Sequence, residues 1–157
     1  MIWPFSSQSA RDGRPIFLCH GCFDRIHVGH VGHLEEVGQL AHKQGGLVWV
    51  SITADPFVHK GRGRPLMTAV ERATIISHLK MVDHVVIDPN RTAVQAIKSI
   101  KPQWYCKGAD YRNKEPSADL AAEIAAVRSI GGDVLYTSEP VRHSTDYLRR
   151  YMDANRI

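Results

Sequence analysis

The sequence predicts an α/β fold, a Rossmann-like doubly wound five-stranded parallel sheet with helices on both faces. Short apolar runs alternate with helical patterns five times along the 157 residues, and no hairpin turn joins two runs directly. Strands that are joined by helices run parallel in one sheet. The polar and glycine-rich segments follow the apolar runs. We therefore expect a ligand site at the carboxyl ends of the strands.

Each element has its own signal in the chain. The apolar runs predict strands over 15–19, 47–53, 83–88, 103–106 and 133–137. The helical patterns predict helices over 28–43, 68–80, 92–100, 118–130 and from about 144 to 152. Apolar residues recur every three or four positions in the first helix, which Gly45-Gly46 should end. Thr68 and Glu71 have the spacing of a capping box.

Composition is that of one globular domain, because 43% of the residues are hydrophobic and 23% are charged. We assign it to 14–157, after a flexible N-terminal extension over 1–13. No apolar run reaches the ~20 residues that span a bilayer, and the N-terminus lacks the pattern of a leader peptide. We therefore expect a cytoplasmic protein that does not insert into membranes.

The net charge of +4 and the pI near 9.1 reflect a small basic excess. The densest basic clusters are 60–64 and 142–150, and both lie in or next to the expected site. This placement favours small phosphorylated ligands as partners over nucleic acid.

The cysteines allow an alternative. Cys19 and Cys22 form a Cys-x-x-Cys pair between a strand and a helix, which is where thioredoxin-like proteins keep a redox pair. Cys106 stands alone, and there is no second pair for a metal site. Because Cys19 lies in an apolar run, we interpret it as a core residue and Cys22 as a turn residue.

The segment 17–30 predicts a strand, a tight turn and the start of a helix. A helix start offers backbone N–H groups and the positive end of the macrodipole to phosphate. His27 and His30 lie three residues apart at this start, which places their imidazoles on one face. His33 lies six residues after His27, off that face, so we expect no three-histidine metal site.

The segment Gly21-Cys22-Phe23-Asp24-Arg25-Ile26-His27-Val28-Gly29-His30 resembles the signature of the cytidylyltransferase-like nucleotidyltransferases, whose hallmark is His-x-Gly-His. The resemblance extends over 15–152. It includes 51–55, the basic loop 60–65, Glu71-Arg72, 82–86, 107–111 and 143–145 in the order of the family. The Lys-Gly-x-Asp-Tyr element and the Gly-Arg-Pro loop look most like the adenylyltransferases that make ADP-heptose from heptose 1-phosphate, and less like glycerol-3-phosphate cytidylyltransferase.

The resemblance implies an enzyme that joins a nucleoside triphosphate, with ATP favoured, to a phosphorylated sugar and releases pyrophosphate. It implies catalytic roles for His27, His30 and Lys60. The implied nucleotide-binding residues are Gly21, Cys22, Phe23, His27, Gly29, His30, Arg62, Lys107, Asp110, Arg142, Ser144 and Thr145. The implied substrate-binding residues are Asp24, Asp55, Lys60 and Arg72. Mg²⁺ is the implied cofactor, with Asp24 as a weak candidate ligand, and family members are often homodimers.

Other readings remain open at this point. A cytidylyltransferase acting on glycerol 3-phosphate is the second enzyme. A non-catalytic nucleotide-binding module is the alternative of another class, because His20 and Asp146 depart from the pattern of the family. For Asp24 alone, a helix cap is the simplest structural role.

Overall fold

The computed structural model describes residues 2–3, 12–138 and 144–155. Its strands are β1 (Ile2–Trp3), β2 (Ile16–Gly21), β3 (Leu47–Thr53), β4 (His84–Asp88), β5 (Trp104–Lys107) and β6 (Asp133–Tyr136). They form one sheet in the order β1-β4-β3-β2-β5-β6, and every neighbouring pair is parallel. The α/β fold and the five predicted strands are confirmed.

The sheet has one strand more than the sequence analysis predicted. Ile2 and Trp3 pair with Val85 and Val86 along the outer edge of β4, inside the stretch that we expected to be a flexible extension. A two-residue strand is too short to show a periodic pattern. Its effect is to cover part of an edge that would otherwise present unpaired backbone groups.

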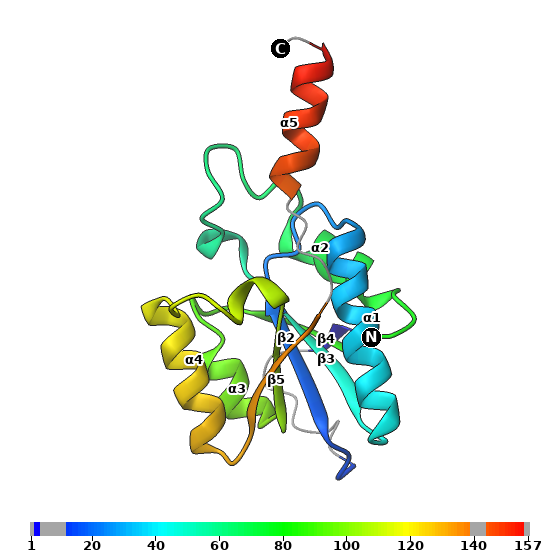
Figure 1. Ribbon diagram of the computed structural model, residues 1–157, viewed down its shortest axis with the longest axis vertical. Coiled ribbons are helices and arrows are strands. Elements are labelled where there is room, and N and C mark those ends of the chain that lie inside the picture. The colour runs from blue at the N-terminus through cyan, green and yellow to red at the C-terminus, as the bar shows by residue number, and fades with distance from the viewer. Residues whose placement is uncertain (1, 4–11, 139–143, 156–157) are drawn as a thin grey trace.

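Helices cover both faces of the sheet (Figure 1). They are α1 (Val28–Lys43), α2 (Ala69–Ser77), α3 (Val94–Ile100), α4 (Ala118–Ser129) and α5 (Ser144–Asn155), with short 3₁₀ turns at Asp55–Phe57 and Ala109–Tyr111. One core cluster holds α1 and α2 against one face, and a second holds α3 and α4 against the other. α5 extends away from the sheet (Figure 1). Within the described ranges, no helix combines the length and apolar character needed to cross a bilayer.

The core explains the continuous apolar runs in the sequence. All seven residues of β3 are buried, as expected for a central strand covered on both faces. Two helix-to-strand turns also require glycine. A Cβ at Gly46 would lie 2.6 Å from the Pro15 carbonyl oxygen, and one at Gly132 would lie 2.5 Å from that of Pro102. These close approaches bring α1 and α4 back onto the sheet.

The strand order reverses at β2, since the chain leaves it toward β3 and β4 and later crosses to β5 and β6. In open parallel sheets, ligands bind in the crevice outside the carboxyl ends of the strands at such a switch point. A ligand site is therefore expected between the loops that follow β2 and β5.

Candidate active site

A pocket of about 500 Å³ lies at this switch point. Its walls come from the end of β2 and the loop after it, the start of α1, the basic loop, and the segment after β5. The lining residues are His20, Gly21, Cys22, Phe23, His27, Gly29, His30, His33, Lys60, Cys106, Lys107, Gly108, Ala109, Asp110, Tyr111 and Thr137. Nine of the residues predicted from the sequence are thus brought together: Gly21, Cys22, Phe23, His27, Gly29, His30, Lys60, Lys107 and Asp110.

The two signature histidines cap the helix that they begin. His27 is the N-cap of α1, and its Nδ1 accepts a hydrogen bond from the Gly29 N–H at 3.1 Å. His30 Nδ1 accepts from the His27 N–H at 3.3 Å, which completes a capping box. The ring centroids lie 3.9 Å apart, so the two imidazoles share one face as predicted. Two N–H groups at the helix start are therefore taken up by the histidines themselves.

This capping fixes the chemistry of both rings. An imidazole whose Nδ1 accepts a hydrogen bond carries its proton on Nε2, so the Nε2–H is a donor. Burial lowers the pKa of His30 to about 3, and the charges of His27, Lys60 and His33 add to the shift. His30 is therefore neutral at physiological pH. It can donate a hydrogen bond to an anion without carrying a charge.

Two further aromatic or polar contacts complete this wall. His33 Nδ1 lies 2.9 Å from the Thr137 hydroxyl, and both residues line the pocket. The Tyr147 ring of α5 lies 5.5 Å from the His27 ring, centroid to centroid. Neither contact was predicted from the sequence. The spacing of three residues between His30 and His33 was the available signal, since it places both on one helix face.

The segment after β5 forms the other wall. Lys107 is buried, and its ammonium lies 4.6 Å from the centroid of the Tyr111 ring. The Asp110 carboxylate folds back over Gly108, where a Cβ would lie 2.7 Å from Oδ1. Any side chain at position 108 would therefore displace a pocket carboxylate. Tyr111 ends the Lys-Gly-x-Asp-Tyr motif and lines the pocket, although it is not one of the predicted site residues.

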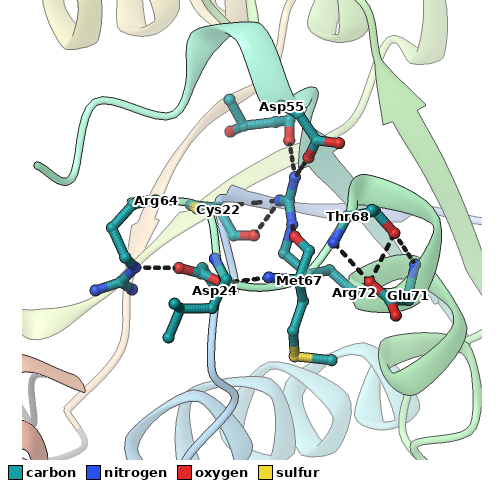
Figure 2. A network of polar contacts seen from close by, with 10 residues as sticks. Cys22, Asp24, Asp55, Arg64, Met67, Thr68, Glu71 and Arg72 are labelled. Carbon is teal, nitrogen blue, oxygen red and sulfur yellow. Dashed lines mark hydrogen bonds and ion pairs between the residues drawn. The ribbon is translucent and has the colours of Figure 1, made fainter. Parts of the chain in front are cut away.

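The basic loop contributes its residues unequally. Lys60 lines the pocket, whereas Arg62 is exposed and does not. Arg64 turns inward, and its Nε donates to Asp24 Oδ2 at 2.5 Å (Figure 2). The loop thus places one cation at the pocket and uses another as an anchor.

Asp24 occupies a different position from the one predicted. It is fully buried and does not line the pocket. Its Oδ2 accepts from Arg64, and its Oδ1 accepts from the N–H groups of Leu66 at 3.0 Å and Met67 at 3.2 Å. Burial alone would raise the pKa of Asp24, but Arg64 and the two N–H groups outweigh it and the pKa is lowered. The carboxylate supports the basic loop and is not a helix cap, because His27 caps α1.

Asp24 does not fit a magnesium ligand, because both of its oxygens are already engaged. Within the described part of the chain, no group of three histidine, cysteine or acidic side chains could hold a metal ion. Magnesium is often held by one or two carboxylates and the substrate's own phosphates. Among the described residues, no cluster of side chains forms a magnesium site without phosphate ligands.

Arg72 is likewise internal. Only 1% of the residue is exposed, and its guanidinium donates to the carbonyl oxygens of Met67 at 3.0 Å, Cys22 at 2.5 Å and Thr53 at 2.8 Å (Figure 2). It also pairs with Asp55 at 2.5 Å, whose side chain is 41% exposed. The burial of the guanidinium distinguishes this pair from an ordinary surface ion pair. Arg72 and Asp55 join the segments that hold Cys22, Thr53 and Met67, and neither lines the pocket.

These anchors hold a strained loop. Phe23 and Arg25 on either side of Asp24 have φ angles of 50° and 58°, which non-glycine residues rarely adopt. Such conformations persist where surrounding contacts determine them, and they cluster at functional sites. Arg72 holds the carbonyl before this stretch and Arg64 holds its centre. The loop that enters the signature helix is therefore fixed in advance of any ligand.

Three predicted residues come from the last part of the chain. Arg142 lies outside the described residues. Ser144 and Thr145 begin α5, although their side chains lie outside the description. Their roles stay predictions.

The cysteines are not arranged as the redox alternative predicts. Cys19 and Cys106 are register partners on adjacent strands, and both are buried. Cys22 is half-buried in the pocket wall, and all three are free thiols. The buried neighbour of Cys19 is thus Cys106, in place of the Cys22 thiol that a Cys-x-x-Cys redox pair would use.

Comparison with known proteins places this geometry in a family. The bifunctional protein HldE of Aliarcobacter butzleri is 39% identical over 123 residues, which are 76% of this chain and 25% of that protein. The bifunctional protein HldE of Geobacter metallireducens is 34% identical over 151 residues, or 94% of this chain and 29% of that protein. The chain therefore spans between a quarter and a third of the length of these relatives.

Solved structures share the fold. A lipopolysaccharide core biosynthesis protein from Thermoplasma volcanium superposes with a TM-score of 0.66 at 21% identity, over 82% of this chain and all of that one. A macrolide-efflux protein from Streptococcus pneumoniae gives a TM-score of 0.61 at 17% identity, over 96% of this chain and 55% of that one. The profile of the cytidylyltransferase-like family matches residues 18–150. The chain belongs to the cytidylyltransferase-like family, as its His-x-Gly-His signature predicted.

Proposed function

We propose that this chain is a nucleotidyltransferase domain. A phosphate oxygen of a phosphorylated sugar attacks the α-phosphorus of a nucleoside triphosphate, and the bond to the leaving pyrophosphate breaks. The product is a nucleotide-activated sugar. No side chain has to act as a nucleophile, because the attacking oxygen comes from the acceptor and the enzyme supplies positioning and charge stabilisation.

The capped histidine pair is the observation that carries this proposal. The transition state places extra negative charge on the α-phosphate oxygens and on the departing pyrophosphate. His27 and His30 supply donors whose orientation is set by their own Nδ1 contacts with the backbone. Donors that need no reorganisation stabilise developing charge most effectively. Lys60 adds a positive charge in the same pocket.

We base the choice of acceptor and of nucleoside triphosphate on the resemblance of the segment 107–111. This segment favours ATP and heptose 1-phosphate, with ADP-heptose as the product. CTP with glycerol 3-phosphate is the alternative pair. We include Mg²⁺ in the reaction as the partner of the triphosphate. The same proposal includes a domain over 14–157, a cytoplasmic location and a homodimer. Light scattering on the purified chain tests the dimer.

The test measures pyrophosphate release with each common nucleoside triphosphate and a panel of acceptors led by heptose 1-phosphate and glycerol 3-phosphate. His27→Asn and His30→Gln keep a side-chain acceptor for the helix cap and replace the imidazole Nε2–H with an amide N–H that lies in a different position. We expect each to lower kcat by about 10²–10³-fold. The control is His42→Gln, which changes an exposed histidine at the far end of α1.

Release with one pair of substrates supports the proposal and names both of them. Nucleotide binding without release across the panel supports the non-catalytic module instead. Release that both histidine variants retain in full would contradict the assigned roles.

A further inference from the structure

Lys107 is a buried basic residue in the wall of the pocket. Only 8% of the residue is exposed, yet it lines the pocket. Its ammonium faces two aromatic rings, with centroids at 4.6 Å for Tyr111 and 5.3 Å for Tyr105. Among the residues that the structure describes, no carboxylate forms an ion pair with it. Burying an unpaired charge is costly, so the pocket is built for an anion that arrives with the ligand.

One of these two rings, that of Tyr105, is held by a buried carboxylate. The Tyr105 hydroxyl donates to Glu123 Oε2 at 2.8 Å, and the Ala93 N–H donates to Oε1 at 2.9 Å. Glu123 is 6% exposed and comes from α4. Tyr105 is held at its hydroxyl end by the carboxylate, and its ring lies under the ammonium. A fixed carboxylate thus sets the ring on which the cation sits.

We propose that Lys107 is the centre of a phosphoryl-binding subsite, separate from the histidine pair, and that Glu123 is a positioning residue that acts through Tyr105. The inference deepens the proposed function and rests on it for the origin of the phosphoryl group. That group belongs either to the nucleoside triphosphate or to the phosphorylated acceptor. Both sources present the same tetrahedral oxyanion to an ammonium.

The charges around Lys107 set its protonation. Burial lowers the pKa of Lys107, whereas the charges of Glu123, Cys19 and Asp110 raise it. These groups come from α4, β2 and the 3₁₀ turn after β5, and the Tyr105 and Tyr111 hydroxyls are neutral at physiological pH. Among the charges that raise the pKa of Lys107, that of Glu123 has the largest effect. Neutralising it should therefore make the ammonium lose its proton at a lower pH.

The first test replaces the cation at constant length. Titration calorimetry with pyrophosphate and with ATP compares the full chain with Lys107→Met. We expect at least one probe to bind ten-fold or more weakly, with less dependence on salt. The melting temperature without ligand should stay the same or rise, because a costly buried charge is gone. Lys98→Met on the exposed side of α3 is the control, and it should bind both probes normally.

The KM of each substrate identifies the source of the phosphoryl group. In turnover assays, a rise in KM for the triphosphate alone assigns the subsite to the nucleotide. A rise for the acceptor alone assigns it to the sugar phosphate. Unchanged binding and unchanged KM for both substrates in Lys107→Met would overturn the subsite. If that variant does not fold, Lys107→Gln is judged by the same result.

The positioning role has its own readout. Glu123→Gln keeps a side-chain acceptor for Tyr105 and removes the charge, so pyrophosphate binding should weaken. The alkaline limit, which is the pH above which binding is lost, should move to lower pH. Tyr105→Phe keeps the ring and loses the hydroxyl, so binding should weaken without that shift. An alkaline limit that stays in place in Glu123→Gln would contradict the role of Glu123.

The subsite and the proposed function fail separately. Loss of pyrophosphate binding in Lys107→Met, together with no turnover by the unmodified chain, leaves the subsite standing and removes the transferase. Turnover by the unmodified chain that persists unchanged in Lys107→Met does the reverse.

Discussion

At the scale of single residues, the two signature histidines have structural and chemical roles at once. Their Nδ1 atoms close the first turn of α1, and their protonated Nε2 atoms are donors. The sequence predicted the pair, its shared face and its place after a strand. It predicted backbone amides as the anion contact, whereas two of these amides bind the histidine rings. The spacing of residues reports which face they share but does not report how a side chain turns.

Two partly buried histidines predict how stability depends on pH. Burial lowers the pKa of His20 and of His30 to about 3 in the folded protein, against about 6.5 in an unfolded chain. The unfolded state therefore binds more protons between these values, and the unfolding free energy falls as pH drops from about 6.5 toward 3. Urea unfolding at several pH values should show this fall. His30→Gln should reduce its slope by about 1 kcal/mol per pH unit.

The matched control for that series is His42→Gln, which leaves the capping box and the pocket alone. Its slope should equal that of the unmodified chain. Parallel slopes for His30→Gln and the unmodified chain would contradict the neutral state of His30 in the folded protein.

Arg72 predicts the largest loss of stability from one substitution. Arg72→Met leaves three carbonyl oxygens that had accepted hydrogen bonds, from Cys22, Thr53 and Met67, without their donor. We expect a loss of about 3–5 kcal/mol in the unfolding free energy. Arg128→Ala is the control, because its ion pair with Asp133 is exposed and worth about 1 kcal/mol or less. Similar losses in both variants would show that the internal network does not hold the loops together.

At the scale of elements, the sequence predicted most accurately where local signals are strong. The bounds of α1 agree with the prediction over 28–43, because apolar spacing and the following glycines mark both ends. The Thr68 and Glu71 capping box forms as predicted. The interior positions of Asp24 and Arg72 depend on partners that are distant in the chain. Asp24 binds Leu66, which is 42 residues away, and Arg72 binds Cys22, which is 50 residues away. Nothing local distinguishes such a residue from one that faces a ligand.

Asp24 links the basic loop to the loop that enters α1. Asp24→Asn weakens the contact to Arg64 and changes the acceptor for Leu66 and Met67. The loop should then open more often, so limited trypsin digestion after Lys60 and Arg62 should become at least several-fold faster. The KM for a phosphorylated substrate should rise, since Lys60 is less well held. Cleavage rates are read from mass spectra of timed samples.

The control is Asp12→Asn, which breaks an exposed ion pair with Arg14 far from the loop in sequence. Its cleavage at Lys60 and Arg62 should match the unmodified chain. Equal protection in Asp24→Asn would mean that the carboxylate is not the anchor of the loop.

At the scale of the whole molecule, the parallel sheet explains why distant segments meet. β2 and β5 are neighbours, so the loop with the histidines and the segment after Lys107 line one pocket although they are far apart in the chain. The alternation of strands and helices sufficed to predict that the loops converge. It did not predict which strands are adjacent, nor the edge strand β1, because strand order depends on packing between elements. The pocket membership of His33 and Thr137 follows from that packing.

The central claim is transfer of an intact nucleotidyl group to a phosphorylated sugar, and ³¹P NMR of the reaction tests it most directly. With ATP, heptose 1-phosphate and Mg²⁺, we predict pyrophosphate together with two coupled doublets, which mark a diphosphate with both ends esterified. His27→Asn should slow the appearance of both. ADP with free phosphate, or a spectrum in which every substrate of the panel stays unchanged, would contradict the account.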